Sequence, residues 1–337
     1  MRLFLKRTAF LIPLLVVRYS QVFGVGDKSR EKCKEYASFV YADEEVPVLR
    51  INAGKSSVSR CGIVEVPLII GGSKAVRKEF PHMALIGFGN STISWQCGGS
   101  LISESFVLTA AHCLESPNTG PATKVRAGLT NQKNPEDGMQ ERNIAERIKH
   151  PKYQLPARYH DVGLIKVNDP FDLNAEIRPA CLHTENDIPG TKGIATGFGK
   201  QAFERENGSD DLMKVQLTYV PENDCRKTFK VDIGGRQLPD GLIPSLICAG
   251  ELGGGKDTCQ VIGGFEMKSF SAFPYRLPIS LQGDSGGPLQ RVLNNPYCMY
   301  SIVGVTSFGK FCGFKNSPAI YSRVASYIDW IESNVWP

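Results

Sequence analysis

The sequence predicts an all-β domain, because short apolar runs recur between turn residues along most of the chain. Each run is four to six residues long and rich in Val, Ile, Leu or Phe, with Gly, Pro and Asn in the intervals. Several short strands separated by turn signals are typical of a β-sandwich or a β-barrel. The clearest runs are residues 83–88, 105–109, 162–167 and 302–305.

The C-terminus carries the one segment whose pattern convincingly predicts a helix. Apolar side chains recur there at helical spacing, so they share one face. We expect this face to dock on the β-domain rather than to bind a partner. The residues are Val324, Tyr327, Ile328, Ile331 and Val335.

Length and composition indicate one large domain with an N-terminal extension. The chain has 337 residues, of which 42% are hydrophobic, enough for a sizeable core. Its net charge of +5 comes without a long basic run, so nucleic acid is not an expected partner. Residues 27–67 are charged and lack long apolar runs, and we interpret them as an extended linker.

The first 24 residues predict a secretory signal peptide. Basic residues precede a short apolar run at residues 9–17. That run is too short to span a bilayer, and no later segment is long and apolar enough. We therefore expect a secreted, extracellular chain without a membrane span. An uncleaved anchor is the alternative, although Arg18 follows the run at once.

Ten cysteines in a secreted chain predict disulfides rather than a metal site. No C-x-x-C pair occurs, so we expect no zinc or other metal, and no cofactor. Two Asn-x-Ser/Thr triplets, at Asn90 and Asn207, permit glycosylation. The cysteines are Cys33, Cys61, Cys97, Cys113, Cys181, Cys225, Cys248, Cys259, Cys298 and Cys312.

A serine between glycines is the strongest chemical signal in the chain. Ser285 lies in the segment 283–288, Gly-Asp-Ser-Gly-Gly-Pro, where a tight turn can direct backbone N–H groups at an oxyanion. A serine hydroxyl is a weak nucleophile until a base takes its proton and a third group orients that base. His112 and Asp161, each beside a strand-like run, supply these groups in the order His, Asp, Ser.

The Gly-x-Ser-x-Gly pattern also fits the nucleophile elbow of α/β-hydrolases. That fold places the acid and the histidine after the serine. Here His112 and Asp161 both precede Ser285, so the order argues against an α/β-hydrolase.

The chain resembles the trypsin/chymotrypsin family of serine proteases over residues 69–337. The resemblance lies in the run 69–72, the segments around His112 and Asp161, and the run 283–289. It implies two packed six-stranded antiparallel β-barrels with a C-terminal α-helix.

The resemblance also implies a role for each site residue. Ser285 attacks the scissile carbonyl, and His112 acts as general base and then as general acid. Asp161 holds the imidazole tautomer and stabilises its cation. The N–H groups of Gly283 and Ser285 form the oxyanion hole.

Asp257, ahead of the serine motif, aligns with the residue at the base of the family's primary specificity pocket. A buried carboxylate there needs a cation, so cleavage after Arg or Lys is implied. Ser307, Gly309 and Ala319 are expected to line the pocket. Family members usually have Gly where Ala319 stands and Trp where Phe308 stands. The extra methyl group should narrow the pocket.

Residues 68–72, Leu-Ile-Ile-Gly-Gly, resemble a zymogen activation site. Cleavage after Leu68 would free the amine of Ile69, which by analogy pairs with Asp284 and orders the pocket. An enzyme that cuts after Arg or Lys should not cleave after Leu68. We therefore expect an upstream protease of chymotrypsin-like preference.

The resemblance implies specific disulfide pairs. It implies Cys97–Cys113, Cys225–Cys248 and Cys259–Cys312. It also implies Cys61–Cys181, which would tether the pro-segment to the protease domain after cleavage. Parity then suggests a bond between the remaining Cys33 and Cys298.

The segment from Cys33 to Cys61, with Val-Pro-Leu at 66–68, resembles the linker of Snake-like arthropod clip-domain proteases. A clip domain needs six cysteines, and two precede the protease, so no intact clip domain is expected. The expected domains are a signal peptide at 1–24, a pro-segment at 25–68 and a protease at 69–337.

This resemblance implies partners as well. Such enzymes work in extracellular cascades of immunity or development. It implies protein substrates that are themselves downstream zymogens, an upstream activating protease and serpin-type inhibitors. We expect the protease to be a monomer.

A 22-residue segment, 261–282, interrupts the serine motif just before Gly283. The His–Asp separation is 49 residues and the Asp–Ser separation is 124, against about 45 and about 93 in the family. Without the insertion the second separation is 102. Long insertions are tolerable on surfaces, but this one abuts an N–H group that must be accurately placed.

Three interpretations of the insertion remain open. It resembles a retained short intron, because its removal restores the motif in register. In addition, Val codons begin with GT and one Gln codon is CAG, which match the two ends of an intron. It is alternatively a regulatory loop. In the third interpretation the chain is an inactive variant that works as a protease-like binding or decoy protein. Sequencing the transcript across residues 260–283 separates the first interpretation from the others.

Overall fold

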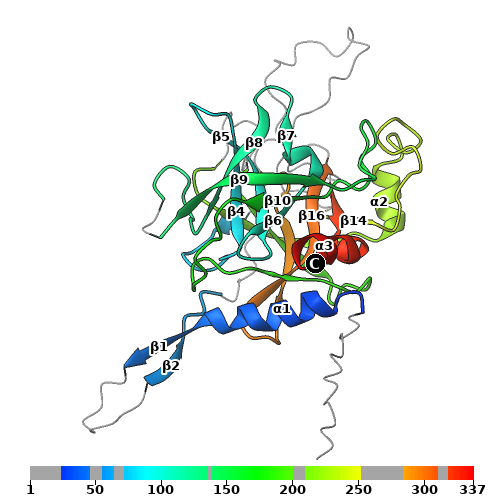
Figure 1. Ribbon diagram of the computed structural model, residues 1–337. Helices are drawn as coiled ribbons and strands as arrows, with labels where there is room; N and C mark the ends of the chain where they lie inside the picture. The colour runs from blue at the N-terminus through cyan, green and yellow to red at the C-terminus, as the bar shows by residue number, and fades with distance from the viewer. Residues whose placement is uncertain are drawn as a thin grey trace, which may run out of the picture.

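The computed structural model describes residues 24–45, 55–63, 72–135, 138–199, 209–251, 284–309 and 318–337. Two β-barrels make up most of this part of the chain, and an N-terminal and a C-terminal helix lie next to each other beside them (Figure 1). The predicted fold class, two six-stranded antiparallel barrels with a C-terminal helix, is confirmed.

The first barrel is a closed ring of six antiparallel strands. In ring order these are β4 (Met83–Phe88), β5 (Ser94–Leu101), β6 (Phe106–Thr109), β10 (Gly163–Val167), β9 (Gln140–Lys149) and β8 (Gly120–Ala127). The ring closes at β4, where Ala84 lies opposite both Gly99 and Ala127. A short strand, β7 (Glu115–Ser116), extends it beside β8. Fully buried aliphatic side chains fill the interior, among them Leu108 and Ile165.

The second barrel closes in the same way. Its strands are β12 (Lys192–Gly197), β13 (Met213–Tyr219), β14 (Leu246–Gly250), β17 (Ala319–Arg323), β16 (Met299–Gly309) and β15 (Pro288–Leu293). β15 returns to β12, and all these pairings are antiparallel. Two short strands add to the ring, β11 (Cys181–Leu182) parallel to β16 and β3 (Ser73–Lys74) antiparallel to β13. Leu217, Leu289 and Tyr321 fill the core.

The predicted C-terminal helix is present and docked. It consists of a 3₁₀ turn, η3 (Val324–Tyr327), followed by α3 (Ile328–Val335). All five residues of the predicted apolar face are buried, and they belong to the same core cluster as the first barrel. Full burial of an aliphatic side chain contributes about 1.5–3 kcal/mol, so this face is sufficient to hold the helix on the domain.

The N-terminal segment is not the extended linker that its composition suggested. It forms helix α1 (Asp27–Ala37), a 3₁₀ turn η1 (Ser38–Val40) and a hairpin of β1 (Tyr41–Glu45) and β2 (Lys55–Ser59). The hairpin projects away from the barrels (Figure 1). The helix buries Ser29, Cys33 and Tyr36, about one side chain a turn. Such a narrow and partly polar stripe gives little helical periodicity in the sequence.

Contacts with distant residues hold α1 in place. The carboxylate of Glu332, on α3, accepts hydrogen bonds from the backbone N–H groups of Gly26 at 3.0 Å and Ser29 at 2.7 Å. It therefore satisfies the N–H groups of the N-cap residue and of a first-turn residue, and puts a negative charge at the positive end of the helix. Tyr36 donates a hydrogen bond to Glu104 at 3.2 Å. None of these partners is close in sequence, which is why the helix was missed.

Two of the expected disulfides are present and two are corrected. The structure contains Cys97–Cys113 and Cys225–Cys248. The expected Cys61–Cys181 and Cys33–Cys298 pairs were wrong, since the bonds are Cys33–Cys181 and Cys61–Cys298. Cys259 and Cys312 lie outside the described residues.

The exchange of partners follows from helix α1. The helix packs against β11 and brings the Cα of Cys33 to 4.8 Å from that of Cys181. After the hairpin, the chain returns so that the Cα of Cys61 lies 5.8 Å from that of Cys298. Four cysteines permit three connectivities, and sequence parity does not distinguish them.

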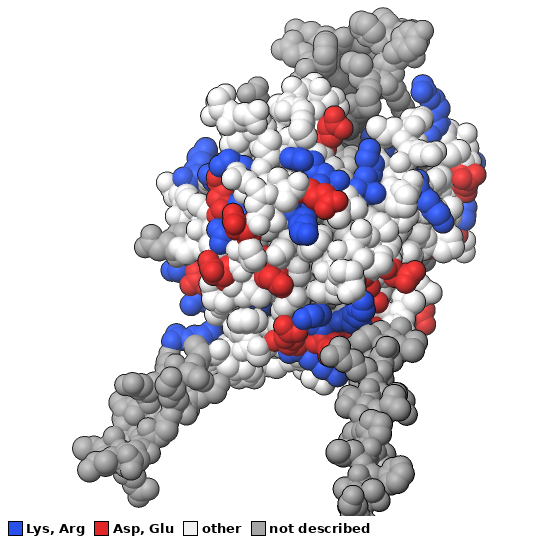
Figure 2. All heavy atoms as spheres, in the orientation of Figure 1, with Lys and Arg blue, Asp and Glu red and all other residues white. Residues whose placement is uncertain are grey.

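One further helix, α2 (Glu222–Thr228), was not predicted. It is two turns long, and Cys225 anchors it to Cys248 on β14. No helix in the described ranges is long and apolar enough to cross a membrane. On the face seen in Figure 2, basic and acidic side chains are interspersed rather than gathered into a patch of one sign.

Candidate active site

His112 is presented by a short 3₁₀ turn, η2 (Ala111–Cys113), directly after β6. Two constraints fix this turn. The neighbouring Cys113 is bonded to Cys97 on β5, and the backbone N–H of His112 donates to Asp161 Oδ1 at 3.0 Å. The imidazole is 16% exposed, so it reaches the surface while its backbone is anchored in the first barrel.

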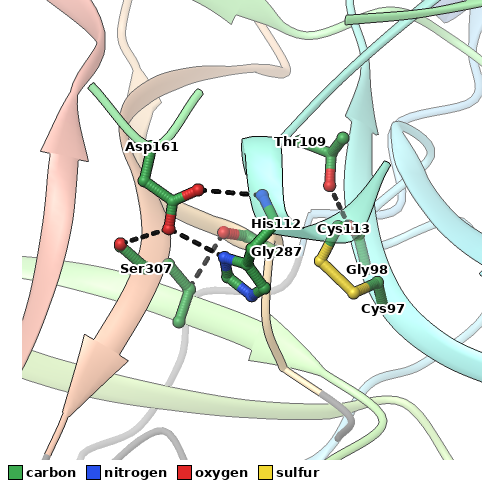
Figure 3. Close-up of a disulfide and its surroundings, with 9 residues drawn as sticks. Cys97, Gly98, Thr109, His112, Cys113, Asp161, Gly287 and Ser307 are labelled. Atoms are coloured by element: carbon green, nitrogen blue, oxygen red, sulfur yellow. Dashed lines mark hydrogen bonds and ion pairs between the residues drawn. A yellow bond between two sulfur atoms is a disulfide. The ribbon is translucent and has the colours of Figure 1, made fainter. Parts of the chain in front are cut away.

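Asp161 is fully buried just before β10 and points at His112 (Figure 3). Its Oδ2 lies 2.7 Å from His112 Nδ1 and accepts a second hydrogen bond from the hydroxyl of Ser307 at 2.5 Å. Burial alone would raise the pKa of Asp161. The attraction of His112 and the hydrogen bonds from His112 and Ser307 outweigh it, so the pKa is lowered. A carboxylate held ionised here orients the imidazole through Nδ1.

Ser285 lies in the turn that leads into β15, the strand of the second barrel that begins at Pro288. The residue is buried, at 1% exposure. The hydroxyl oxygen of Ser285 and the Nε2 atom of His112 are both buried, and neither has a hydrogen-bond partner among the described residues. The two atoms are therefore not hydrogen-bonded to each other, and no described residue makes a competing hydrogen bond to either of them.

The turn that carries Ser285 is pinned to both barrels. The carbonyl of Ser285 accepts a bond from the N–H of Gly98, on β5, at 2.8 Å. The N–H of Gly286 donates to Thr306 O, on β16, at 2.9 Å. His112 and Asp161 come from the first barrel and Ser285 leads into the second, so the three residues belong to the junction between the barrels.

Gly286 is a position where no other residue fits. Its φ of +76° is left-handed, and a Cβ added there would approach Gly98 O at 2.6 Å and collide with Thr109 Oγ1. Thr109 is itself fixed, because its hydroxyl donates to Gly98 O at 2.8 Å. The glycine beside the serine is therefore required by close packing between the barrels.

Asp284 precedes Ser285, and its carboxylate lies against Gly197 and Gly199. Its Oδ1 accepts a hydrogen bond from the N–H of Gly199 at 2.7 Å, and the side chain is 9% exposed. A Cβ at either Gly197 or Gly199 would collide with this carboxylate. These glycines leave a space into which the carboxylate fits.

Three of the expected pocket residues lie together on β16 and β17. Gly309 and Ala319 are register partners across these strands, and Ser307 and Ala319 are completely buried. Phe308 turns the other way and packs at 6.2 Å, ring to ring, on Phe229. Ser307, which was expected to line the pocket, also donates a hydrogen bond from its hydroxyl to Asp161.

Several expected site residues lie outside the described residues. The insertion 261–282 is among them, and so are the expected activation, pocket, oxyanion and glycosylation residues Leu68, Ile69, Asp257, Gly283 and Asn207. Asn90 is described, and it is exposed in the turn between β4 and β5.

Sequence reasoning missed the supports of Asp161. The hydroxyl of Ser322 donates to the backbone carbonyl of Asp161 at 2.8 Å. Ser307 and Ser322 belong to no motif near Asp161, since both lie about 150 residues further along the chain. A hydroxyl buried on a strand gives no signal of its partner in the sequence.

Metal ligation has little support in the described part of the chain. One group there has suitable spacing, Cys97, His112 and Cys113. The two cysteines are bonded to each other, so they offer no thiolate.

Comparisons with known proteins agree with this geometry. The Trypsin family model matches residues 69–261 and 276–331. The break in the match, 262–275, falls inside the segment interpreted as an insertion. Serine protease snk of Drosophila melanogaster is 36% identical over 310 residues, 90% of this chain and 64% of that protein.

Two other relatives are similar over most of this chain. Serine protease Hayan of Drosophila melanogaster is 35% identical over 80% of this chain and 39% of its own length. CLIP domain-containing serine protease B4 of Anopheles gambiae is 32% identical over 84% of this chain and 75% of its own length. The chain spans less than two thirds of the first two.

Proposed function

Because the chain belongs to the trypsin family of serine proteases, we propose that it is a secreted serine endopeptidase made as a zymogen. The observation that carries the proposal is the bond between His112 Nδ1 and the buried, low-pKa carboxylate of Asp161. This bond leaves Nε2 for the hydroxyl of Ser285 at the barrel junction.

The proposed reaction is acyl transfer through this triad. His112 takes the proton of Ser285 as its oxygen attacks the scissile carbonyl, and then gives that proton to the leaving amine. Asp161 keeps Nδ1 protonated and stabilises the imidazolium. The N–H groups of Gly283 and Ser285 stabilise the oxyanion, where loss of one donor typically costs about 3–4 kcal/mol.

We propose cleavage after Arg or Lys, with Asp257 as the residue that binds the cationic side chain. Support comes from its register with the serine motif, and from Gly309 and Ala319, which lie opposite each other on β16 and β17. The methyl group of Ala319 is fully buried at that wall. It leaves less room in the pocket than a glycine would. The relative rates of cleavage after Arg and after Lys are therefore measured in the experiment below.

The proposed activation is cleavage after Leu68, followed by pairing of the Ile69 amine with Asp284. The glycine-lined space around the Asp284 carboxylate supports a role for that carboxylate in the switch. Because Leu68 is not basic, the enzyme should not activate itself. Purified chain that cleaves itself at Leu68, while a Ser285→Ala control stays intact, would contradict this.

The proposed setting is an extracellular proteolytic cascade. A relative named Phenoloxidase-activating factor 3, from Holotrichia diomphalia, is 29% identical to this chain over 305 residues. Protein substrates that are zymogens, an upstream activator and serpin-type inhibitors are the partners proposed. Segment 24–63 would stay attached after cleavage at Leu68, because two disulfides join it to the protease domain.

A second candidate function follows from residues 261–282. The break in the family match falls inside this segment, next to the proposed oxyanion donor Gly283. If the insertion prevents formation of the oxyanion hole, the chain would be a protease-like binding protein. Its intact His112, Asp161 and Ser285 favour catalysis, and the position of the insertion favours the binding protein.

One experiment tests both functions. The chain is cleaved at Leu68 and assayed on Arg, Lys and Leu peptide reporters, with and without residues 261–282. We expect hydrolysis of the Arg and Lys reporters and none of the Leu reporter. Hydrolysis by both forms supports an active protease with a tolerated loop. Activity of the shortened form alone supports the binding protein, and inactivity of both would overturn the proposal.

A further inference from the structure

His160, the residue directly before Asp161, has a strained backbone. Its φ is +55°, in the left-handed region that residues other than Gly seldom occupy, although Asn, Asp and His do so more often than the rest. Such a conformation costs about 1–3 kcal/mol and persists where the surroundings determine it. Since Asp161 is the next residue, the contacts that hold His160 also fix the direction in which the Asp161 side chain leaves the backbone.

A second histidine holds the ring of His160. The imidazoles of His150 and His160 are stacked, with ring centroids 5.3 Å apart and an interplanar angle of 19°. Tyr327 stands edge-on to both rings, at 5.1 Å from His150 and 6.0 Å from His160. Trp330 stands edge-on to His150 at 5.0 Å. The pair is thus held between its own loop and the C-terminal helix.

The backbone of His150 supports the other side of Asp161. The N–H of His150 donates to the carbonyl of Val162 at 3.1 Å, and the N–H of Val162 donates to the carbonyl of His160 at 2.8 Å. His150 therefore holds the residue before Asp161 through its ring and the residue after it through its backbone. Ser322 holds the carbonyl of Asp161 itself.

The stacked pair is arranged to be neutral. Burial, and then the nearby His160 and Lys152, lower the pKa of His150 to about 4. Burial, and then Lys152, lower the pKa of His160. Two imidazolium rings in stacking contact would repel each other. The groups that interact with the two rings are Lys152 from the same loop and Tyr327 and Trp330 from the C-terminal helix. The backbone N–H of Tyr153 donates to the carbonyl of His150 at 3.0 Å, and the Tyr153 hydroxyl interacts with Asp161 and Arg158.

We propose that His150 and His160 are positioning residues for Asp161, acting as a neutral stacked pair behind the triad. They fix the peptide from which Asp161 reaches His112, without touching substrate. The catalytic consequence rests on the proposed function, but the placement of Asp161 does not. Protonation of either ring would loosen the stack, so the same pair would make the His112–Asp161 contact sensitive to acid.

The first test measures the His112–Asp161 bond directly in the complete chain. The proton on His112 Nδ1, hydrogen-bonded to a buried carboxylate, gives a resonance at the low-field end of the proton NMR spectrum. His150→Phe keeps a flat ring on His160, whereas His150→Ala removes it. We expect the resonance to persist in His150→Phe and to be shifted or lost in His150→Ala. An unchanged resonance in His150→Ala would overturn the proposal.

Acid unfolding of the same variants gives a readout that needs no activity. A histidine with a depressed pKa takes up its proton more readily in the unfolded chain. Folding stability therefore falls as the pH drops from about 6.5, the ordinary histidine value, towards the folded value of about 4. We expect the acid-unfolding midpoint of His150→Phe to lie at lower pH than that of the wild type. A midpoint unchanged or higher would show that His150 is not held neutral.

Kinetics of the cleaved chain complete the test. Misplacing a catalytic group by about 1 Å can cost about 100-fold in rate, so His150→Ala should lower kcat by about 10- to 100-fold with little change in KM. His150→Phe should restore most of kcat. A rise in KM at constant kcat would contradict positioning. A cleaved wild type without activity would contradict the proposed function, while the resonance would still decide this proposal.

Discussion

The barrel junction and the surface under helix α1 are both built from residues far apart in the sequence, but they are held in different ways. At the junction, short hydrogen bonds and one obligatory glycine fix His112, Asp161 and Ser285. Under α1, two disulfides and the capping carboxylate of Glu332 hold a segment that contributes nothing to the triad. Accurate placement is therefore concentrated at the junction, whereas attachment is sufficient at α1.

Removal of the serine hydroxyl should have the largest effect on the junction. Ser285→Ala leaves no nucleophile, and we expect a loss of about 10⁴-fold or more in kcat on the Arg reporter. The free energy of unfolding should change little, because the hydroxyl has no hydrogen-bond partner among the described residues. The measurement is steady-state hydrolysis by the cleaved chain, followed by urea unfolding. Residual activity within 10-fold of the wild type would remove Ser285 from the mechanism.

Gly286→Ala tests whether close packing holds the junction. The new methyl group would collide with Thr109 and approach Gly98 O, and alanine is strained at this φ. We expect a loss of activity together with a fall of about 2 kcal/mol or more in the free energy of unfolding, measured in urea.

Gly190→Ala is the matched control for that variant. Gly190 also has a left-handed φ, +85°, but a Cβ there meets nothing within 4 Å. The free energy of unfolding of this variant should fall only by the cost of the strained backbone conformation, about 1 kcal/mol, and its activity should be kept. Equal losses in the two glycine variants would show that packing at Gly286 is unimportant.

Ser307→Ala should have a smaller effect at the same site. A hydrogen bond to a charged group contributes about 1.5–3 kcal/mol, so we expect kcat/KM to fall by about 10-fold or more. The hydroxyl also helps to lower the pKa of Asp161. A depressed pKa contributes stability that is present above the unfolded value of 3.8 and is lost as the pH falls through the folded value. The variant should therefore lose stability at a higher pH than the wild type.

Ser301→Ala provides the control for Ser307→Ala. Ser301 is a buried serine on the same strand, and the described contacts of Asp161 do not include it. It should leave the acid-unfolding curve in place. Coincident curves for wild type and Ser307→Ala would contradict the assigned contact.

Glu332→Gln should have the smallest effect, and that effect should be confined to the region of helix α1. Loss of the charge weakens the cap of α1 by about 1 kcal/mol, while Cys33–Cys181 still holds the helix. We expect faster hydrogen exchange in residues 27–37 and no change in kcat. The control is Asp329→Asn, which changes an exposed carboxylate on α3, the helix that carries Glu332. A large loss of activity in Glu332→Gln would mean that the two regions are coupled.

The sequence was informative where a local motif and the chemistry coincide. Ser285 between glycines, His112 after a strand and Asp161 before one were predicted together, and so was the docked face from Val324 to Val335. The barrels followed from the spacing of strands and from the resemblance. These features depend on residue types within a few positions of each other.

What the sequence did not predict depends on long-range contacts. Helix α1 has a narrow stripe of buried residues and is capped by Glu332, 306 positions away from Gly26. The pairing of Cys33 with Cys181 depends on that helix, so assigning a linker there led to the wrong disulfides. Ser307 on β16 and Ser322 on β17 both support Asp161 from the second barrel, and neither belongs to a motif around Asp161.

The most direct test of the account is covalent labelling of Ser285 by a serine-phosphonylating reagent after cleavage at Leu68. Such a reagent reacts with a serine only where a base and an oxyanion hole activate it. The account predicts one label per chain, located on Ser285 by peptide mass spectrometry and abolished by His112→Ala. Absence of the label, both from the complete chain and from the chain without residues 261–282, would contradict the claim that His112, Asp161 and Ser285 form a working triad.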